Sequence, residues 1–231
     1  MTPFNSINKT YFITGIDTDA GKTIITGAIA KYLHDKGINI ITQKLSQTGC
    51  INQSEDIQVH RKMMGVETYP EDQEGLTCPY VFPLPCSPHL AAKLEQTRID
   101  PAKLKAATTE LSNRYECVLV EGVGGLMVPL NEEVLLIDYL KDCNYPVILV
   151  TSGKLGSINH TLLSLDACKH RGINVVGMVF NHFGASNPVI TDDTISVFRE
   201  QLGKYYPEAK LVEVPILEDK TKPVDFSILF G

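Results

Sequence analysis

Residues 15–23 read Gly-Ile-Asp-Thr-Asp-Ala-Gly-Lys-Thr, and this stretch decides the fold. The run Tyr11-Phe12-Ile13-Thr14 before it is typical of a buried strand, and the residues from Lys22 onward have helical spacing. Between a strand and a helix, successive backbone N–H groups can hold phosphates, while Lys22 supplies a cation and Thr23 offers a hydroxyl to Mg²⁺. The stretch therefore predicts a phosphate-binding loop, or P-loop, for MgATP or a close relative.

The spacing of this loop is unusual. Five residues, Ile16 to Ala20, lie between its two glycines, whereas the ordinary P-loop pattern has four.

Short apolar runs alternate with helical segments along the rest of the chain. Continuous rather than alternating apolar runs are typical of strands covered on both faces, and strand–helix repetition favours a parallel sheet with right-handed crossovers. We therefore expect one α/β domain over residues 1–231, with a mainly parallel, P-loop NTPase-like sheet and helices on both faces. The predicted strands are 10–14, 38–42, 117–120, 147–151, 175–180 and 211–214, and the main predicted helices are 22–36, 56–64, 101–114, 158–171 and 191–205.

Residues 66–89 interrupt this rhythm, because they contain five prolines and few periodic apolar residues. The strand–helix pattern resumes directly afterwards, so we expect a long functional loop or insertion here rather than a linker.

Composition excludes several classes of partner. The 21 basic and 27 acidic residues give a net charge of −6 without a dense basic block, which argues against nucleic acid. The six cysteines include no CxxC pair and are expected to be reduced thiols. Residues 1–9 lack an apolar signal core, and no apolar run approaches the roughly 18 residues that span a bilayer. We expect a cytoplasmic protein without membrane insertion.

Polar residues at the predicted strand ends are the next candidates, because parallel α/β sheets bind ligands beyond the carboxyl ends of their strands. Glu121 follows the strand 117–120 and precedes Gly-Val-Gly-Gly, so its carboxylate could hold Mg²⁺ opposite Thr23. Lys44 ends the second strand and could stabilise a second anion near the γ-phosphate. Asp56 opens the next helix, where the helix dipole alone could also account for an acid.

Two further segments have weaker signals. Cys86-Ser87-Pro88-His89-Leu90 contains a point at which a helix could start, and His89 could be a loop histidine without chemistry. Gly156-Ser157-Ile158-Asn159-His160 follows the fourth apolar strand and could form a carboxylate cradle or an ordinary helix cap.

Together these motifs resemble the dethiobiotin synthetase family. The matching segments, in order, are residues 15–23, Lys44 through Thr48-Gly49, Asp56, Ser-Pro-His-Leu-Ala-Ala at 87–92, Glu-Gly-Val-Gly-Gly at 121–125, Gly-Ser-Ile-Asn-His at 156–160, Asn181 and Val-Pro-Ile-Leu at 214–217. The five-residue spacer in the P-loop resembles the family's own form. The likeness departs from the family at Leu45, where proline is frequent.

The resemblance implies a fold, an activity and a set of site residues. The activity would be ATP-dependent closure of a cyclic urea from 7,8-diaminononanoate and CO₂, through a carbamate and a carbamic-phosphoric anhydride, with release of ADP and phosphate. Lys22 and Lys44 would be catalytic, and Thr23, Asp56 and Glu121 would hold Mg²⁺. Substrate would be bound by Thr18, Thr48, Ser87, Gly156, Ser157 and Asn159. ATP would be bound by Asp19, Ala20, Gly21, Lys22, Thr23, Ile24, Asp56, Glu121, Gly122, Val123, Gly124, Asn181, His182, Pro215, Ile216 and Leu217. The resemblance also implies a homodimer in which the helix start at 156–159 of the partner subunit receives the substrate's carboxylate tail.

Three alternative functions are less consistent with these motifs. A ParA/MinD-like ATPase switch usually has an additional lysine in the P-loop, at the position occupied here by Ile16. A GTPase would need Asn-Lys-x-Asp after a late strand, where this chain has Asn181-His182-Phe183-Gly184. A cobyrinate-type amide synthetase would need an ammonia source, for which 231 residues leave no room, and it is the runner-up.

Overall fold

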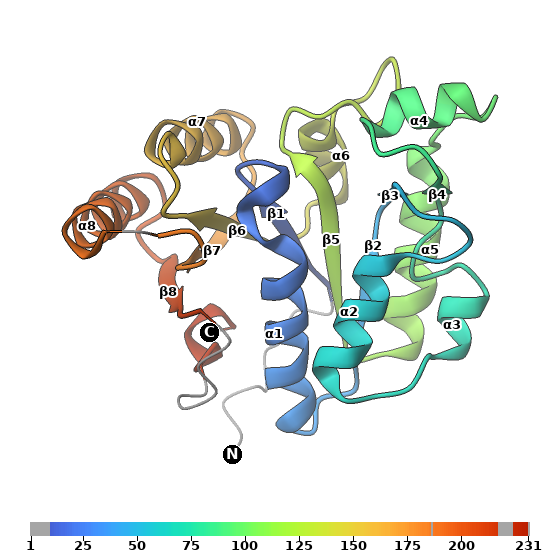
Figure 1. Cartoon of the computed structure of the whole chain (residues 1–231), viewed down its shortest axis with the longest axis horizontal. Coiled ribbons are helices and arrows are strands. Elements are labelled where there is room, and N and C mark those ends of the chain that lie inside the picture. The colour runs from blue at the N-terminus through green and yellow to red at the C-terminus, as the bar shows by residue number, and fades with distance from the viewer. Residues whose placement is uncertain (1–9, 186, 217–223, 231) are drawn as a thin grey trace.

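The computed structural model describes residues 10–185, 187–216 and 224–230. Its centre is a six-stranded, fully parallel sheet in the order β2-β5-β1-β6-β7-β8 (Figure 1). The strands are β1 (Thr10–Gly15), β2 (Ile40–Lys44), β5 (Cys117–Gly125), β6 (Val147–Ser152), β7 (Val175–Asn181) and β8 (Lys210–Val214). The predicted parallel α/β sheet is confirmed, although β2 starts two residues later and reaches Lys44.

The central strands are buried on both faces, which explains their continuous apolar sequences. In β5, for example, Val118, Leu119 and Val120 are all inaccessible to solvent. Figure 1 shows α1 (Lys22–Asp35) and α2 (Glu55–Met64) in front of the sheet, and α5 (Pro101–Arg114) and α6 (Leu136–Cys143) behind it. The helices α7 (Ser157–His170) and α8 (Pro188–Tyr205) follow β6 and β7.

Local capping explains several helix boundaries. Helix α5 starts where predicted, because Pro101 occupies its first turn and the Asp100 side chain accepts a hydrogen bond from the Ala102 backbone. Ser54 caps α2 in the same way by accepting from the Ile57 backbone. The short helix α6 has no side-chain cap, and the sequence patterns did not predict it.

The proline-rich segment 66–89 contains more regular structure than predicted. It carries α3 (Pro70–Gln73), β4 (Val81–Phe82) and the start of α4 (Pro88–Leu94). The strand β4 pairs in parallel with β3 (Gln47–Thr48) to form a second, two-stranded sheet. The segment thus carries short elements of its own, two of which begin at Pro70 and Pro88, because proline is favoured in the first turn of a helix. That it is a functional loop or insertion rather than a linker stays a prediction.

The strand order reverses at β1, whose neighbours β5 and β6 come later in the chain. In open parallel sheets this reversal creates a crevice beyond the carboxyl ends of the strands. A 3₁₀ turn, η1 (Thr18–Ala20), lies at that edge, and a second, η2 (Ser227–Leu229), contacts β8. Within the described ranges, no helix is both long and apolar enough to cross a membrane.

Candidate functional site

The P-loop connects the carboxyl end of β1 to the start of α1. Gly21 adopts a φ of +89°, and a Cβ atom at this position would lie 2.2 Å from the Asn181 side-chain amide, so both conformation and space require glycine. No side chain caps the start of α1. Its first backbone N–H groups therefore lie at the helix end that favours anions.

Lys22 lies folded back within this loop. Its Nζ donates to the backbone oxygens of Asp17, at 2.7 Å, and Thr18, at 3.4 Å. Burial and the nearby Lys44 ammonium lower the pKa of Lys22 to about 8. A phosphate group would supply the negative charge that this buried cation lacks.

The Lys44 side chain, at the end of β2, contacts Asp56 in the first turn of α2 and Glu121 within β5. The Lys44 Nζ lies 2.5 Å from Asp56 Oδ2 and 2.7 Å from Glu121 Oε1. The Thr23 hydroxyl donates to the same Glu121 Oε1 at 3.0 Å. The structure thus brings together all five residues that the sequence analysis assigned to the catalytic and metal positions, Lys22 included.

The electrostatics of this cluster keep its partners charged. Burial alone would raise the pKa of Glu121, but the Lys44 ammonium and the His60 hydrogen bond outweigh it and hold this pKa well below its ordinary range. Burial alone would lower the pKa of Lys44, but the carboxylates of Glu121 and Asp56 raise it above its ordinary value. Both groups are therefore ionised near neutral pH.

The oxygen atoms in this cluster fit Mg²⁺ chemically. Mg²⁺ prefers oxygen ligands and is usually held by one or two carboxylates together with water and substrate phosphates. Here the carboxylates of Asp56 and Glu121 converge on one cation, Lys44, and the Thr23 hydroxyl contacts one of them. Over the described parts of the chain, no group of three or more His, Cys, Asp or Glu side chains is arranged to hold a metal, so phosphate and water would have to complete the shell.

The predicted substrate residues Thr48 and Ser87 come from neighbouring segments. Thr48 lies in β3 opposite Phe82 of β4, and Ser87 occupies the N-cap position of α4, which contacts β3. Both residues are partly exposed. Thr18, in η1, is exposed on the other side of Lys22, whose Nζ contacts its backbone oxygen.

Three of the residues predicted to bind ATP line one pocket. His182, Pro215 and Ile216 border a pocket of about 650 Å³ at the carboxyl ends of β7 and β8. Asn181, by contrast, is buried beside the P-loop and donates through its amide to the Ala20 backbone oxygen at 3.2 Å. Leu217 lies outside the described residues.

The remaining predicted ATP residues adjoin the P-loop or β5. Asp19 and Ile24 are exposed on η1 and α1, and Ala20 is fully buried between them. Gly122, Val123 and Gly124 continue β5 beyond Glu121. A Cβ at Gly124 would lie 3.9 Å from the Thr18 hydroxyl, so this strand end approaches η1 closely.

The start of α7 is separate from Thr48 and Ser87. Gly156 has a φ of +90° and precedes the helix, Ser157 is buried, and Asn159 is exposed. The preceding Lys154 lies 3.8 Å from the Asp19 carboxylate, so this turn adjoins the P-loop.

One group at the centre of the site was not predicted from the sequence. His60 is fully buried, and its Nε2 lies 2.9 Å from Glu121 Oε2. The available signal was its position four residues after Asp56, which puts both side chains on one face of α2. Three residues of the pocket beside His182 were not predicted either: Glu213, Asn187 and Thr191.

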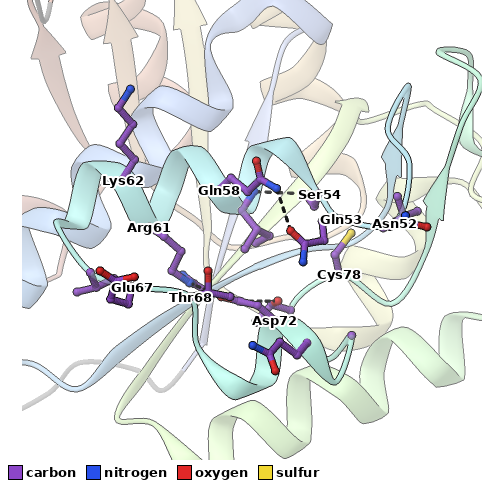
Figure 2. Close-up of a pocket in the computed structure, with 16 residues that line it drawn as sticks. Asn52, Gln53, Ser54, Gln58, Arg61, Lys62, Glu67, Thr68, Asp72 and Cys78 are labelled. Carbon is purple, nitrogen blue, oxygen red and sulfur yellow. Dashed lines mark hydrogen bonds and ion pairs between the residues drawn. The ribbon is translucent and has the colours of Figure 1, made fainter.

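A second pocket, of about 310 Å³, lies beside α2 and the segment 66–81 (Figure 2). Its lining includes Arg61, Asp72 and Cys78, but none of the predicted site residues.

The chain is similar to known proteins over most of its length. A family model described as an AAA domain matches residues 9–224. The ATP-dependent dethiobiotin synthetase BioD 2 of Pasteurella multocida is 53% identical over 199 residues, which are 86% of this chain and 93% of that protein. The enzyme of the same name from Haemophilus influenzae is 55% identical over 177 residues, 77% of this chain and 93% of that protein. The ATP-dependent dethiobiotin synthetase BioD of Chlorobaculum tepidum is 46% identical over 203 residues, 87% of this chain and 85% of that protein.

Solved structures support the fold. The MinC:MinD cell division complex of Aquifex aeolicus contains a chain that matches with a TM-score of 0.57 at 14% identity, covering 96% of this chain and 93% of that one. The cell division protein FtsY of Thermotoga maritima matches with a TM-score of 0.55 at 12% identity, covering 100% of this chain and 71% of that one. At these identities the likeness concerns the P-loop NTPase-like fold alone.

The sequence relatives are far more similar, and they match over most of both chains. This chain belongs to the ATP-dependent dethiobiotin synthetase family.

Proposed function

We propose that the chain uses ATP to close a cyclic urea from 7,8-diaminononanoate and CO₂, forming dethiobiotin, ADP and phosphate. The observation that carries this proposal is the meeting of Lys22, Lys44, Thr23, Asp56 and Glu121 at one edge of the sheet. Two buried cations beside a P-loop suit a reaction in which two anions, a carbamate and the γ-phosphoryl group, must approach each other.

The P-loop side of the site would bind the nucleotide. The uncapped start of α1 and the Lys22 ammonium would hold the β- and γ-phosphates. Thr23, Asp56 and Glu121 would hold Mg²⁺, which when bound supplies positive charge to the phosphate oxygens. The two positive charges of Lys22 and Lys44 equal the two negative charges of Asp56 and Glu121. These four side chains alone therefore leave little net positive charge to bind the phosphates of ATP.

The substrate side would bind the diamine. Thr18 and Thr48 would contact the carbamate or amine end, and Ser87 would line the same side. Lys44 stands at the end of β2, shortly before β3, and contacts Asp56 and Glu121, so its ammonium would bring the carbamate oxygen toward the γ-phosphoryl group. This position is the reason for assigning Lys44 to transition-state stabilisation.

The reaction then proceeds in three balanced steps. One amine, as the free base, attacks CO₂ and loses a proton, which gives a carbamate. A carbamate oxygen attacks the γ-phosphorus and ADP leaves, which gives a carbamic-phosphoric anhydride. The second amine attacks the carbonyl carbon, loses a proton and expels phosphate, which closes the ring.

The pocket at the ends of β7 and β8 would hold adenine. Its lining combines Pro215 and Ile216, which directly follow β8, with the polar side chains of His182 and Glu213. Asn181 would reach the base from beside Gly21, where its amide now bonds the Ala20 backbone. Asp19, Ala20, Gly21, Ile24, Gly122, Val123, Gly124 and Leu217 complete the proposed ATP site.

A homodimer would complete the substrate site. We propose that the helix start at Gly156, Ser157 and Asn159 of one subunit faces the substrate tail bound by the other. A shallow pocket of about 400 Å³ supports this idea, because it lies between the start of the P-loop, the residues after β5 and α7, and is bordered by Asp17, Met127 and Leu163. Met127 and Leu163 are apolar side chains left more than half exposed.

The test is a coupled turnover assay. Purified protein should release phosphate from ATP only when both 7,8-diaminononanoate and bicarbonate are present, with dethiobiotin detected by mass spectrometry. Reactions lacking either compound, and reactions of a Lys44→Ala variant, serve as controls. Robust phosphate release without the diamine would contradict the proposal. So would turnover of a carboxylic acid with ammonia, which would indicate the amide synthetase reaction instead.

A further inference from the structure

Among the residues that the structure describes, His60 is the one fully buried histidine, and the reaction as proposed gives it no role. Its Nε2 lies 2.9 Å from Glu121 Oε2, and its Nδ1 lies 3.0 Å from the Thr42 hydroxyl. Since Lys44 and Thr23 both bond Glu121 through Oε1, His60 is the group that bonds the other carboxylate oxygen.

The helix α2 places His60 at this point. Asp56 and His60 are four residues apart, so both side chains lie on the face of α2 that meets the strand ends. Asp56 contacts Lys44 from the first turn, and His60 contacts Glu121 from the second. One helix therefore contacts the cluster at two points.

The hydrogen bonds around His60 have one direction. The Arg61 guanidinium can only donate, and its Nη1 donates to the Thr42 hydroxyl oxygen at 2.9 Å. The Thr42 hydrogen is then free to be donated to His60 Nδ1. With Nδ1 as acceptor, the ring proton lies on Nε2, which donates to the ionised Glu121 carboxylate. In this arrangement each group of the series has a hydrogen-bond partner, and none of them has to gain or lose a proton.

The outer end of the series is held by a second segment. Arg61 forms a two-point ion pair with Asp72, with Nε–Oδ2 and Nη2–Oδ1 distances of 2.9 and 2.7 Å (Figure 2). Asp72 also accepts from the Thr77 hydroxyl and the Tyr69 backbone. The guanidinium is thus fixed in orientation by the segment that contains α3.

We propose that Arg61, Thr42 and His60 form a positioning relay that holds Glu121 with its Oε1 atom turned toward Lys44, Thr23 and the metal. The inference rests on the proposed function, because it assigns Glu121 to the Mg²⁺ site. Carboxylates that bind metals are typically oriented by hydrogen bonds from such outer partners, and losing one partner typically costs about 10- to 100-fold in metal affinity or activity. His60 is a positioning residue here, since its ring is fully buried and both of its nitrogens contact protein side chains, those of Thr42 and Glu121.

A merely structural histidine would give a different result from a positioning one. The decisive measurement is binding of Mn²⁺, as a paramagnetic substitute for Mg²⁺, to the protein in the presence of ADP, followed by electron paramagnetic resonance. His60→Leu removes the donor to Glu121 and should weaken Mn²⁺ binding about 10-fold or more. His60→Gln offers an N–H donor and an oxygen acceptor and should recover much of the affinity. In turnover, His60→Leu should lower kcat and leave KM for the diamine nearly unchanged.

A second pair of variants tests the relay without altering the ring. Thr42→Val removes the hydroxyl that fixes the His60 tautomer and should weaken Mn²⁺ binding, whereas Thr42→Ser retains the hydroxyl and should restore it. The matched control is Thr108→Val, which removes a buried hydroxyl on α5 that donates to the Gln43 side chain at 2.6 Å. Gln43, like Thr42, lies on β2, but this hydrogen bond does not involve Glu121. It should lower the melting temperature without changing Mn²⁺ affinity.

The outcomes separate the two proposals. Unchanged Mn²⁺ affinity in folded His60→Leu, or equal weakening by Thr42→Val and Thr108→Val, would overturn the relay. If His60→Leu does not fold, as judged by circular dichroism, the Thr42 pair decides. Absence of diamine-dependent turnover in the unaltered protein would overturn the proposed function, while the Mn²⁺ measurements would still report on the relay.

Discussion

At the scale of single residues, Lys44 links stability to the proposed chemistry. Its ammonium lies between two carboxylates, one of which, Glu121, is fully buried. Removing one member of a buried ion pair leaves an uncompensated charge, which is more costly than the pair is favourable. The residue that would assist catalysis therefore also neutralises the two carboxylates in the folded chain.

The first prediction concerns this double role. Lys44→Ala should lower the free energy of unfolding by about 3 kcal/mol, because Asp56 and Glu121 then repel each other without a cation. Millimolar Mg²⁺ should stabilise the variant more than the unaltered protein, since a divalent cation can neutralise the same oxygens. Urea denaturation with and without Mg²⁺ measures both effects, and turnover should be greatly reduced.

The control for Lys44→Ala is Lys31→Gln, which breaks an exposed pair with Asp35 on α1. It should change stability by no more than about 0.5 kcal/mol and should not respond to Mg²⁺. Equal stability of Lys44→Ala and the unaltered protein would show that the two carboxylates do not depend on Lys44.

At the scale of elements, α2 is held at both of its ends. Ser54 caps its start and also donates to the Gln47 side chain of β3 at 2.7 Å. Arg61, near its end, pairs with Asp72 of α3 and lies over the Tyr69 ring. The segment that looked like a loop in the sequence thus supports the helix that carries Asp56.

The second prediction tests the Arg61–Asp72 pair through pH. Burial alone would raise the pKa of Asp72, but the Arg61 guanidinium outweighs it and lowers this pKa from its ordinary 3.8. A lowered folded-state pKa means that the ionised carboxylate stabilises the fold above pH 3.8 and that this contribution is lost as pH falls through the lower value. Asp72→Asn should therefore cost about 3 kcal/mol near neutral pH and progressively less at acid pH.

Urea denaturation at several pH values measures this difference between Asp72→Asn and the unaltered protein. The control is Asp35→Asn on α1, whose exposed pair with Lys31 should contribute almost nothing at any pH. If the loss of stability in Asp72→Asn stays the same into the acid range, the charge of the Asp72 carboxylate does not account for the stabilisation by this pair.

The same elements show what the sequence could predict. The strands at the centre of the sheet were predictable because they are covered on both faces and are therefore mostly apolar, as in Val147–Ser152, whereas the edge strand β8 is only partly buried. The P-loop and the strand-end residues Lys44 and Glu121 followed from motifs that are local in sequence. His60 and Thr42 were missed because their contacts with Glu121 and with each other depend on packing between distant segments. The helix α6 was missed because no capping residue marks its start.

At the scale of the whole molecule, one edge of the sheet collects every part of the proposed reaction. The P-loop follows β1, Lys44 ends β2, Glu121 lies in β5, and the proposed base pocket lies beyond β7 and β8. The start of α7 follows β6 at the same edge. Figure 1 shows α7 and β3 on opposite sides of β1, which is the reason for proposing that the helix start binds the substrate tail of a second subunit.

The last prediction tests that second subunit. Leu163, on α7, is 61% exposed and borders the shallow pocket beside Asp17, so a glutamate there would place a charge in the proposed interface. Leu163→Glu should reduce the mass measured by light scattering from that of two chains to that of one. It should abolish diamine-dependent turnover and leave the affinity for ADP unchanged, because the P-loop belongs to a single chain. Ile228→Glu is the control, since Ile228 is also half exposed but borders a different pocket, beside Tyr11 and Pro146 at the opposite ends of the strands. A Leu163→Glu protein that stays dimeric would place the interface elsewhere, and a monomer with full activity would show that each subunit binds the whole substrate by itself.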